Sequence, residues 1–308
     1  MSLSPEEFRE HLRLSSATAG ITLPDLELPA AHHVILRGMR FHYLDWGTRG
    51  RPPMLFLHGG GLNVHTWDLV CAALKPERHC LALDQRGHGD SEWSPVMDYG
   101  TESHAEDLDA FVDHIGLERF VLVGMSLGGA NALAWAGRHS ERLAALVLVD
   151  VGPEVRQAGV RKIAAFTSEA TPLDSVEDYV AKALAFNPRR DATLLRRSLL
   201  HNLRRMPDGK WMWKYDQRHR GRAMDPAAAA RRRELLWSAV AKVSCPALVV
   251  RGADSDVFHD EDAERLAAAL PRGRWVKVVN AGHTVQGDNP AGLLVALRAF
   301  LGGAAATG

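Results

Sequence analysis

Short apolar runs recur along the chain, and segments with helical periodicity separate most of them. Six such runs lie at 53–57, 80–84, 120–124, 146–150, 247–251 and 275–279. Apolar runs of about four to eight residues are typical of buried strands, and strands that alternate with helices predict a mainly parallel sheet. Residues 33–36 and 41–46, joined through Gly38, predict an antiparallel pair ahead of it. We therefore expect a doubly wound, eight-stranded α/β sheet.

Two segments do not follow this alternation. Residues 152–242 are far too long for one crossover helix and contain helical stretches of their own at 176–186, 192–205 and 227–240. They predict a helical cap inserted after the sixth strand, between core segments 32–151 and 243–308. Residues 1–31 form an N-terminal extension, and Ser4-Pro5-Glu6-Glu7 supplies the cap, proline and acidic residues typical of a helix start.

The strand at 120–123 runs directly into Gly124-Met125-Ser126-Leu127-Gly128 and then into a predicted helix. A strand that turns at once into a helix strains the backbone at the turn residue, and glycines two positions either side avoid a collision. The turn raises the Ser126 hydroxyl above the sheet, at a helix N-terminus whose partial positive charge favours an oxyanion. This context predicts a nucleophilic serine.

A glycine-rich loop follows the strand at 53–57, in the order His58-Gly59-Gly60-Gly61. Acyl transfer requires two backbone N–H groups directed at the carbonyl oxygen of the substrate. We expect one from Leu127, which follows the nucleophile, and the other from Gly60, with Gly61 as the alternative. Taken alone, the glycines would also fit an ordinary strand-to-helix turn.

The turn after the strand at 80–84 is polar and contains Arg86, His88 and Asp90. Chemistry does not demand these residues, and we interpret the turn as structural. Asp84 and Arg86 are expected to hold the loop beside the nucleophile turn.

A histidine lies in the loop after the last predicted strand, in the sequence Asn280-Ala281-Gly282-His283-Thr284. This position brings His283 to the same edge of the sheet as Ser126. His283 is therefore the candidate base that accepts the serine proton and returns it to the leaving group.

Together these motifs resemble the α/β-hydrolase superfamily. H-G-G-G, D-x-R-G-H-G-x-S, G-x-S-x-G-G and a late A-G-H occur in that order over about residues 32–301. The resemblance implies a nucleophile, an acid and a histidine in that chain order. The chain is most similar to capped serine hydrolases, which include esterases, lactonases and carbon–carbon bond hydrolases. It departs from epoxide hydrolases and haloalkane dehalogenases, which have an aspartate where this chain has Ser126.

Three aspartates are candidates for the acid that orients His283. The resembling pattern G-x-x-S-D-V after the strand at 247–250 favours Asp256, because the aspartate before the apolar residue is expected to turn inward. Asp254 is a weaker alternative in the same loop. Asp150 follows the strand at 146–149, where some members of the superfamily carry the acid, although a structural role there is preferred.

Composition limits the partners. Lys plus Arg and Asp plus Glu each number 37, so nothing in the net charge indicates nucleic acid or an anionic membrane. Cys71, Cys80 and Cys245 are too few and too scattered for a disulfide framework or a zinc site. The start resembles no signal segment, and no apolar run has the length of a membrane helix. We expect a cytoplasmic protein without a cofactor or metal.

The predicted cap is nevertheless strongly basic. Residues 152–242 contain 19 Lys and Arg against 10 Asp and Glu, so the cap carries about +9 and the rest about −9. Such a charge suits an anionic substrate, but docking of the cap on an acidic core is the favoured interpretation.

These features predict a serine hydrolase that cleaves a small carboxylic ester or lactone through an acyl-enzyme. A carbon–carbon bond hydrolase of ring-cleavage dienoates is the alternative with the same residues. A ligand receptor on a hydrolase scaffold is a third and less favoured hypothesis.

Overall fold

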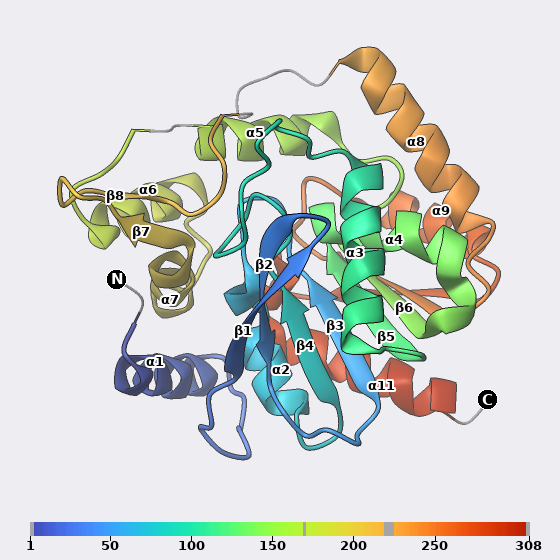
Figure 1. The fold of residues 1–308 in the computed structure, drawn as a ribbon, viewed down its shortest axis with the longest axis horizontal. Helices are drawn as coiled ribbons and strands as arrows, with labels where there is room; N and C mark the ends of the chain where they lie inside the picture. The colour runs from blue at the N-terminus through green and yellow to red at the C-terminus, as the bar shows by residue number, and fades with distance from the viewer. Residues whose placement is uncertain (1–2, 169–170, 219–224, 306–308) are drawn as a thin grey trace.

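The computed structural model describes residues 3–168, 171–218 and 225–305. Its main sheet has eight strands in the order β1-β2-β4-β3-β5-β6-β9-β10 (Figure 1). β1 (Ala30–Leu36) and β2 (Met39–Asp45) form the predicted antiparallel pair. The parallel strands are β3 (Pro53–Leu57), β4 (His79–Leu83), β5 (Phe120–Met125), β6 (Leu143–Val149), β9 (Ala247–Gly252) and β10 (Gly273–Val278). The predicted fold is confirmed.

Helices cover both faces of the sheet, which explains why its central strands are apolar throughout. One face packs against α3 (Thr101–Ile115), α4 (Leu127–His139), α8 (Pro226–Val240) and α9 (Asp260–Ala269). The other packs against α2 (Asp68–Leu74) and α11 (Pro290–Ala305). All six residues of β5 are buried as a result. The short elements η1 (Val64–Trp67), η2 (Ser140–Arg142) and α10 (Val285–Asp288) lie in connecting segments.

The segment between β6 and β9, which we call the cap segment (152–242), has a small core of its own. It contains α5 (Gln157–Ser168), α6 (Val176–Phe186), α7 (Ala192–Asn202), β7 (Leu203–Arg205), β8 (Trp211–Trp213) and α8. α5 lies beyond the edge at which the parallel strands end (Figure 1). Tyr179, Leu199 and Trp213 are among the residues buried between α6, α7 and the β7–β8 hairpin. Residues 169–170 and 219–224 of the predicted cap lie outside the described residues.

Two details of the cap segment differ from prediction. The helix expected over 192–205 ends at Asn202, because Leu203–Arg205 pairs with Trp211–Trp213 as an antiparallel ladder. α8 packs on the core instead of the other cap helices, and Ala239 lies so close to Gly137 of α4 that a Cβ there would be 2.6 Å away.

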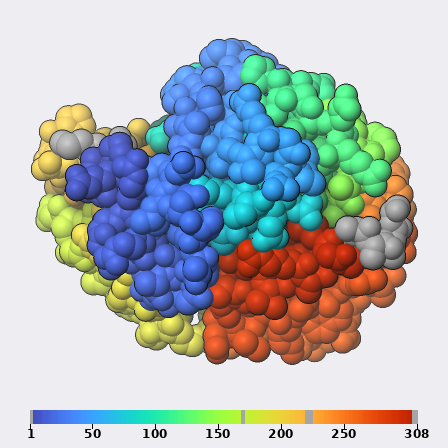
Figure 2. All heavy atoms as spheres, turned by 90° about the horizontal axis from the view of Figure 1, so that it is seen from below, coloured from blue at the N-terminus to red at the C-terminus, as the bar shows by residue number. Residues whose placement is uncertain are grey.

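The N-terminal extension forms α1 (Pro5–Thr18), which begins at the predicted helix start with a capping box between Ser4 and Glu7. α1 packs against both α7 of the cap segment and α2 of the core. In Figure 2 the dark blue N-terminal residues accordingly lie side by side with yellow cap residues. Phe8 meets the ring of His65 on the core and the ring of His201 on the cap segment, both edge to face. The extension therefore bridges the two parts.

Among the helices of the described residues, none combines the length and the apolar character needed to cross a bilayer.

Candidate active site

Ser126 lies at the junction of β5 and α4 in a strained backbone conformation, with φ 51° and ψ −114°. The neighbouring glycines are sterically required. A Cβ on Gly124 would lie 2.5 Å from the carbonyl oxygen of Gly128, and a Cβ on Gly128 would lie 2.5 Å from that of His58. The turn predicted from G-x-S-x-G is therefore present, with the serine at the N-terminus of a 13-residue helix.

His283 follows β10 and reaches across to Ser126, as predicted. Its Nε2 lies 3.0 Å from Ser126 Oγ, and its Nδ1 lies 2.8 Å from Oδ2 of Asp150. An ionised carboxylate only accepts hydrogen bonds, so Nδ1 carries the proton and Nε2 is left to accept from the serine hydroxyl. The side chain of His283 is 17% exposed, and that of Asp150 is fully buried.

The prediction that Asp256 hydrogen-bonds His283 is wrong in this structure. Asp256 turns outward, is half exposed, and pairs with Lys162 of α5 at 2.8 Å. Burial opposes ionisation of Asp256, but the Lys162 ammonium outweighs it and lowers the pKa of the carboxyl. The alternative Asp254 is also partly exposed and pairs with Arg189. The turn after β9 directs Ser255 inward instead, so the interval 254–256 offers a hydroxyl where we expected a carboxylate.

Asp150 is a buried carboxylate with its hydrogen bonds satisfied. Its backbone is left-handed, with φ 53°, and its N–H donates to the Val250 carbonyl at 2.7 Å. Oδ1 accepts from the N–H of Gly252 at 2.9 Å, while Oδ2 accepts from Ser255 Oγ at 2.6 Å as well as from His283. These donors offset the cost of burying the charge.

The glycine-rich loop after β3 is fastened to the start of α4. The His58 carbonyl accepts from Gly128 N–H at 3.1 Å and from Gln85 Nε2 at 2.7 Å. The amide oxygen of Gln85 in turn accepts from Asn131 at 2.7 Å. Gly60 lies beside Leu127, since a Cβ on Gly60 would be 3.9 Å from the Leu127 Cβ. Gln85 and Asn131 could not be found from the sequence, because a lone amide side chain belongs to no motif.

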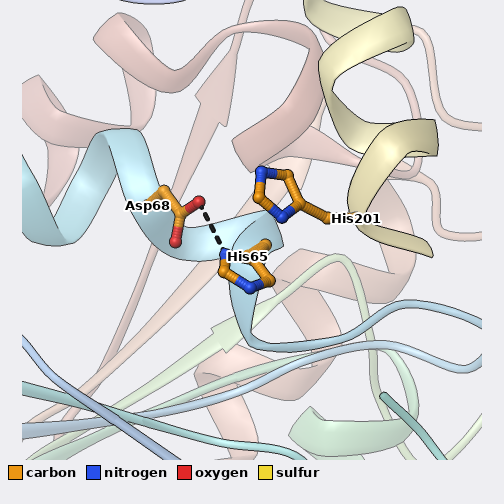
Figure 3. A group of neighbouring side chains, drawn as sticks. All are labelled: His65, Asp68 and His201. Atoms are coloured by element: carbon orange, nitrogen blue, oxygen red, sulfur yellow. Dashed lines mark hydrogen bonds and ion pairs between the residues drawn. The ribbon is translucent and has the colours of Figure 1, made fainter. Parts of the chain in front are cut away.

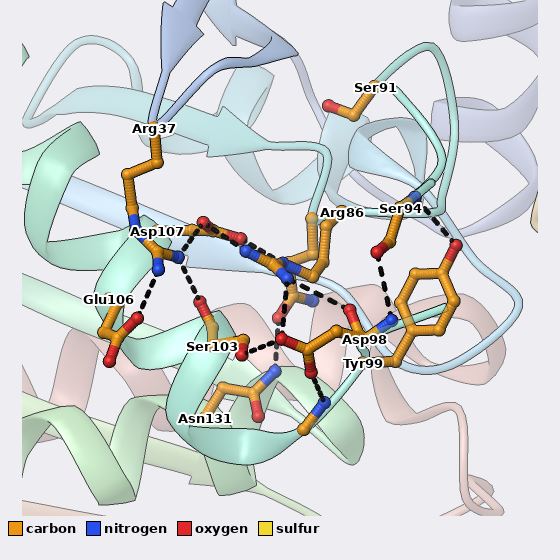
Figure 4. Close-up of polar contacts among 12 residues, drawn as sticks. Arg37, Arg86, Ser91, Ser94, Asp98, Tyr99, Ser103, Glu106, Asp107 and Asn131 are labelled. Carbon is orange, nitrogen blue, oxygen red and sulfur yellow. Dashed lines mark hydrogen bonds and ion pairs between the residues drawn. The ribbon is translucent and has the colours of Figure 1, made fainter. Parts of the chain in front are cut away.

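The loop after β4 is structural, in line with our interpretation. Arg86 is buried and binds Asp107 of α3 through two nitrogens, and its Nη1 donates to the Asp98 carbonyl (Figure 4). Asp84 is buried and accepts from His42 Nδ1 and from the N–H groups of Val64 and Asp90. Burial alone would raise the pKa of Asp84, but the His42 ring and the backbone donors outweigh it and hold that pKa well below its usual value.

A cluster of His65, Asp68 and His201 lies where the cap segment meets the core (Figure 3). These residue types can bind a metal ion, but the two imidazole rings are stacked at 3.8 Å, so their in-plane lone pairs do not converge. The guanidinium of Arg197 binds Asp68 and supplies the neutralising charge. Burial, followed by the charge of neighbouring groups, lowers the pKa of His201 well below its usual value. We interpret the cluster as packing.

Cations of the cap segment pair systematically with carboxylates of the core. The pairs, in addition to Arg197–Asp68, are Arg156–Asp262, Lys162–Asp256, Arg189–Asp254, Arg190–Asp288 and Lys214–Asp90. One pair, between Arg265 and Glu154, has the opposite polarity. This arrangement supports the docking interpretation of the basic cap.

Comparisons with known proteins agree with the fold. The sequence pattern of the alpha/beta hydrolase fold family matches residues 52–290. Over 265 residues the chain is 34% identical to esterase Rv0045c of Mycobacterium tuberculosis, covering 84% of this chain and 85% of that protein. It is 25% identical to a 3-hydroxybutyrate-oligomer hydrolase of Cupriavidus necator, over 85% and 93% of the two chains. A crystal structure of esterase Rv0045c superposes with a TM-score of 0.77 at 32% identity, over 98% and 99% of the chains. The chain therefore belongs to the alpha/beta hydrolase fold family.

Proposed function

We propose that this protein is a serine hydrolase that cleaves carboxylic esters with Ser126, His283 and Asp150. The observation that carries the proposal is the continuous hydrogen-bonded line from Ser126 Oγ through His283 to Asp150, with heavy-atom distances of 3.0 and 2.8 Å. Distances of this size suit a nucleophile, a base and a group that orients the base. The esterase name of a relative with 34% identity supports the same reaction class.

In the acylation step, Ser126 Oγ attacks the carbonyl carbon while its proton passes to His283 Nε2. In this proposal the N–H groups of Leu127 and Gly60 donate hydrogen bonds to the resulting oxyanion. As the tetrahedral intermediate collapses, His283 gives the proton to the alkoxide oxygen that leaves, and an acyl-Ser126 ester remains. Asp150 stabilises the charged imidazolium without taking its proton.

In the deacylation step, His283 Nε2 removes a proton from water, and the hydroxide oxygen bonds to the acyl carbon. The proton returns to Ser126 Oγ as the carbon–oxygen bond to the serine breaks, and the free acid leaves. These steps need no cofactor and no metal. A lactone would follow the same sequence, with the released alcohol still attached to the acyl group.

The carbon–carbon hydrolase hypothesis has less support. It depends on basic groups that hold the substrate carboxylate, and six cations of the cap segment are already paired with core carboxylates. The receptor hypothesis differs in outcome, since a receptor would not turn over a simple substrate many times.

Turnover of p-nitrophenyl butyrate tests the proposal. The wild-type protein is expected to release many equivalents of p-nitrophenol, and Ser126→Ala to lose the activity while its circular dichroism spectrum and melting temperature stay the same. Equal turnover by Ser126→Ala would refute the mechanism. A single equivalent released by the wild-type protein would favour a receptor, and exclusive cleavage of a dienoate would favour the carbon–carbon hydrolase.

A further inference from the structure

The loop after β9 holds a buried hydroxyl that the mechanism above does not use. Ser255 is 5% exposed, and its Oγ lies 2.6 Å from Oδ2 of Asp150. That oxygen is the one that also bonds His283 Nδ1. The other oxygen, Oδ1, is held by the Gly252 N–H. The carboxylate is therefore oriented by two groups, one at the end of β9 and one in the loop that follows it.

The direction of the serine hydrogen bond follows from its neighbours. Ser255 Oγ accepts from the N–H of Val257 at 3.2 Å, so its single proton is free for the carboxylate. Asp150, when ionised, can only accept. The hydroxyl of Ser255 therefore donates to Asp150, as a charge-assisted hydrogen bond of the stronger kind.

The loop that carries Ser255 is itself fixed. Arg251 is 8% exposed, and its guanidinium donates to the carbonyls of Phe258, Ala253 and Ser255. The Ser255 N–H closes a turn to the Gly252 carbonyl at 3.0 Å. Because these hydrogen bonds fix the loop, the Ser255 hydroxyl is already in place to bond the carboxylate. A residue that does not touch the substrate must be fixed in this way to hold a catalytic group in position.

We propose that Ser255 is a positioning residue, which holds the Asp150 carboxylate in the orientation that meets His283 and moderates the charge that the histidine experiences. This inference rests on the proposed function of the Ser126–His283–Asp150 line. It assigns to the loop after β9 a part in the reaction although the acid itself follows β6.

The test measures how fast a fluorophosphonate probe labels Ser126, read by intact mass. This rate reports activation of the serine without requiring the natural substrate. Ser255→Ala is expected to label about tenfold more slowly than wild type, the loss of one hydrogen bond to a charged group. In an Asp150→Asn background, Ser255→Ala is expected to change the rate by less than about twofold, because its partner carboxylate is already gone.

The pH dependence of labelling supplies a readout that a merely structural loss would not move. The charged groups near His283 include Asp150, Asp256 with its partner Lys162, and Asp288, which accepts from the N–H of Gly282 and pairs with Arg190. Removing the Ser255 dipole makes the surroundings of His283 more negative, so the acidic limb of the rate should move to higher pH. Asp256→Asn removes a negative charge and is the matched control. The acidic limb of its pH–rate profile should stay in place or move to lower pH.

The outcomes separate the two proposals. Normal labelling with no ester turnover would sink the esterase function and leave the role of Ser255 standing. Failure of the wild type to label would overturn both. The positioning role is overturned if Ser255→Ala labels like wild type. It is equally overturned if the variant is slowed equally in both backgrounds with an unmoved acidic limb.

Discussion

Asp150 Oδ2 lies 2.8 Å from His283 Nδ1, although 133 positions separate the two residues in the chain. The contact exists because β6 and β9 are adjacent in the sheet and β10 follows β9, so that the ends of all three strands meet at one edge. In the proposed mechanism the acid therefore comes from the end of β6.

Replacing Asp150 by Asn should reduce kcat by about four orders of magnitude, as expected when the orienting carboxylate of such a triad is lost. Ester turnover and a thermal melt measured on the same preparation check this. Asp256→Asn and Asp254→Asn are the matched controls. They should each change kcat by less than about threefold, because both carboxylates form exposed ion pairs. An inactive, folded Asp256→Asn beside an active Asp150→Asn would restore our original assignment.

Gln85 should matter to the rate without touching the substrate. Gln85→Leu preserves the shape but removes the hydrogen bond to the His58 carbonyl, which fixes the glycine-rich loop beside Leu127. We expect kcat to fall by about tenfold with little change in KM, because the oxyanion donors act in the transition state. A change confined to KM would contradict this account.

The buried pair of Arg197 and Asp68 should stabilise the junction between the cap segment and the core. Arg197→Met removes the guanidinium and leaves the buried Asp68 carboxylate with only the His65 ring nitrogen as a side-chain partner, which should cost about 3 kcal/mol in urea unfolding. The neighbouring Arg196→Met is the control, with a cost below about 0.5 kcal/mol, because Arg196 pairs with Glu177 in the solvent. The double variant Arg197→Met, Asp68→Asn should be more stable than Arg197→Met alone. Equal losses for the two arginines would argue against a buried pair.

Acid should weaken the ion pair between Asp216 and Arg218. Burial opposes ionisation of this carboxyl, but Arg218 and Tyr99 outweigh it and lower its pKa to about 2. The pKa of an aspartate in the unfolded chain is about 3.9. The stabilisation of the folded state by Asp216 is therefore complete above about pH 4 and is lost as the pH falls towards 2. Asp216→Asn should cost about 1 kcal/mol at pH 7, a value discounted because Arg218 is half exposed. Unfolding curves at pH 7, 4 and 3 should show that difference shrinking, and a constant difference would contradict the assignment.

The sequence predicted Ser126 and His283 because local pattern determines where they lie. Gly124 and Gly128 specify the turn, and a strand followed by Gly282-His283 specifies the loop. The acid could not be predicted in the same way. Two contacts decide which side chain of residues 254–256 faces inward: the hydrogen bonds of the Arg251 guanidinium to carbonyls of this loop, and the hydrogen bond of Ser255 to the Asp150 carboxylate. The sequence pattern indicates neither contact.

The cap segment also has features that depend on contacts distant in sequence. Residues 203–205 continue the helical pattern of α7, and only the pairing with Trp211–Trp213 draws them into a hairpin. The sequence shows the excess of basic residues in the cap, but it does not show which core carboxylates pair with them. Long charged side chains pair with groups that are close in space, and the periodicity of the sequence does not predict which groups those are.

Positions 150 and 255 reach the same point from two adjacent strands, one with a carboxylate and the other with a hydroxyl. Ser255 Oγ and His283 Nδ1 bond the same oxygen of Asp150, so both positions lie on one side of the histidine. A lineage could therefore transfer the acid from one strand to the other through an intermediate sequence that carries both, without moving the sheet, the serine or the histidine. Such an exchange would change the residues at positions 150 and 255, which are joined here by the hydrogen bond between Ser255 and Asp150.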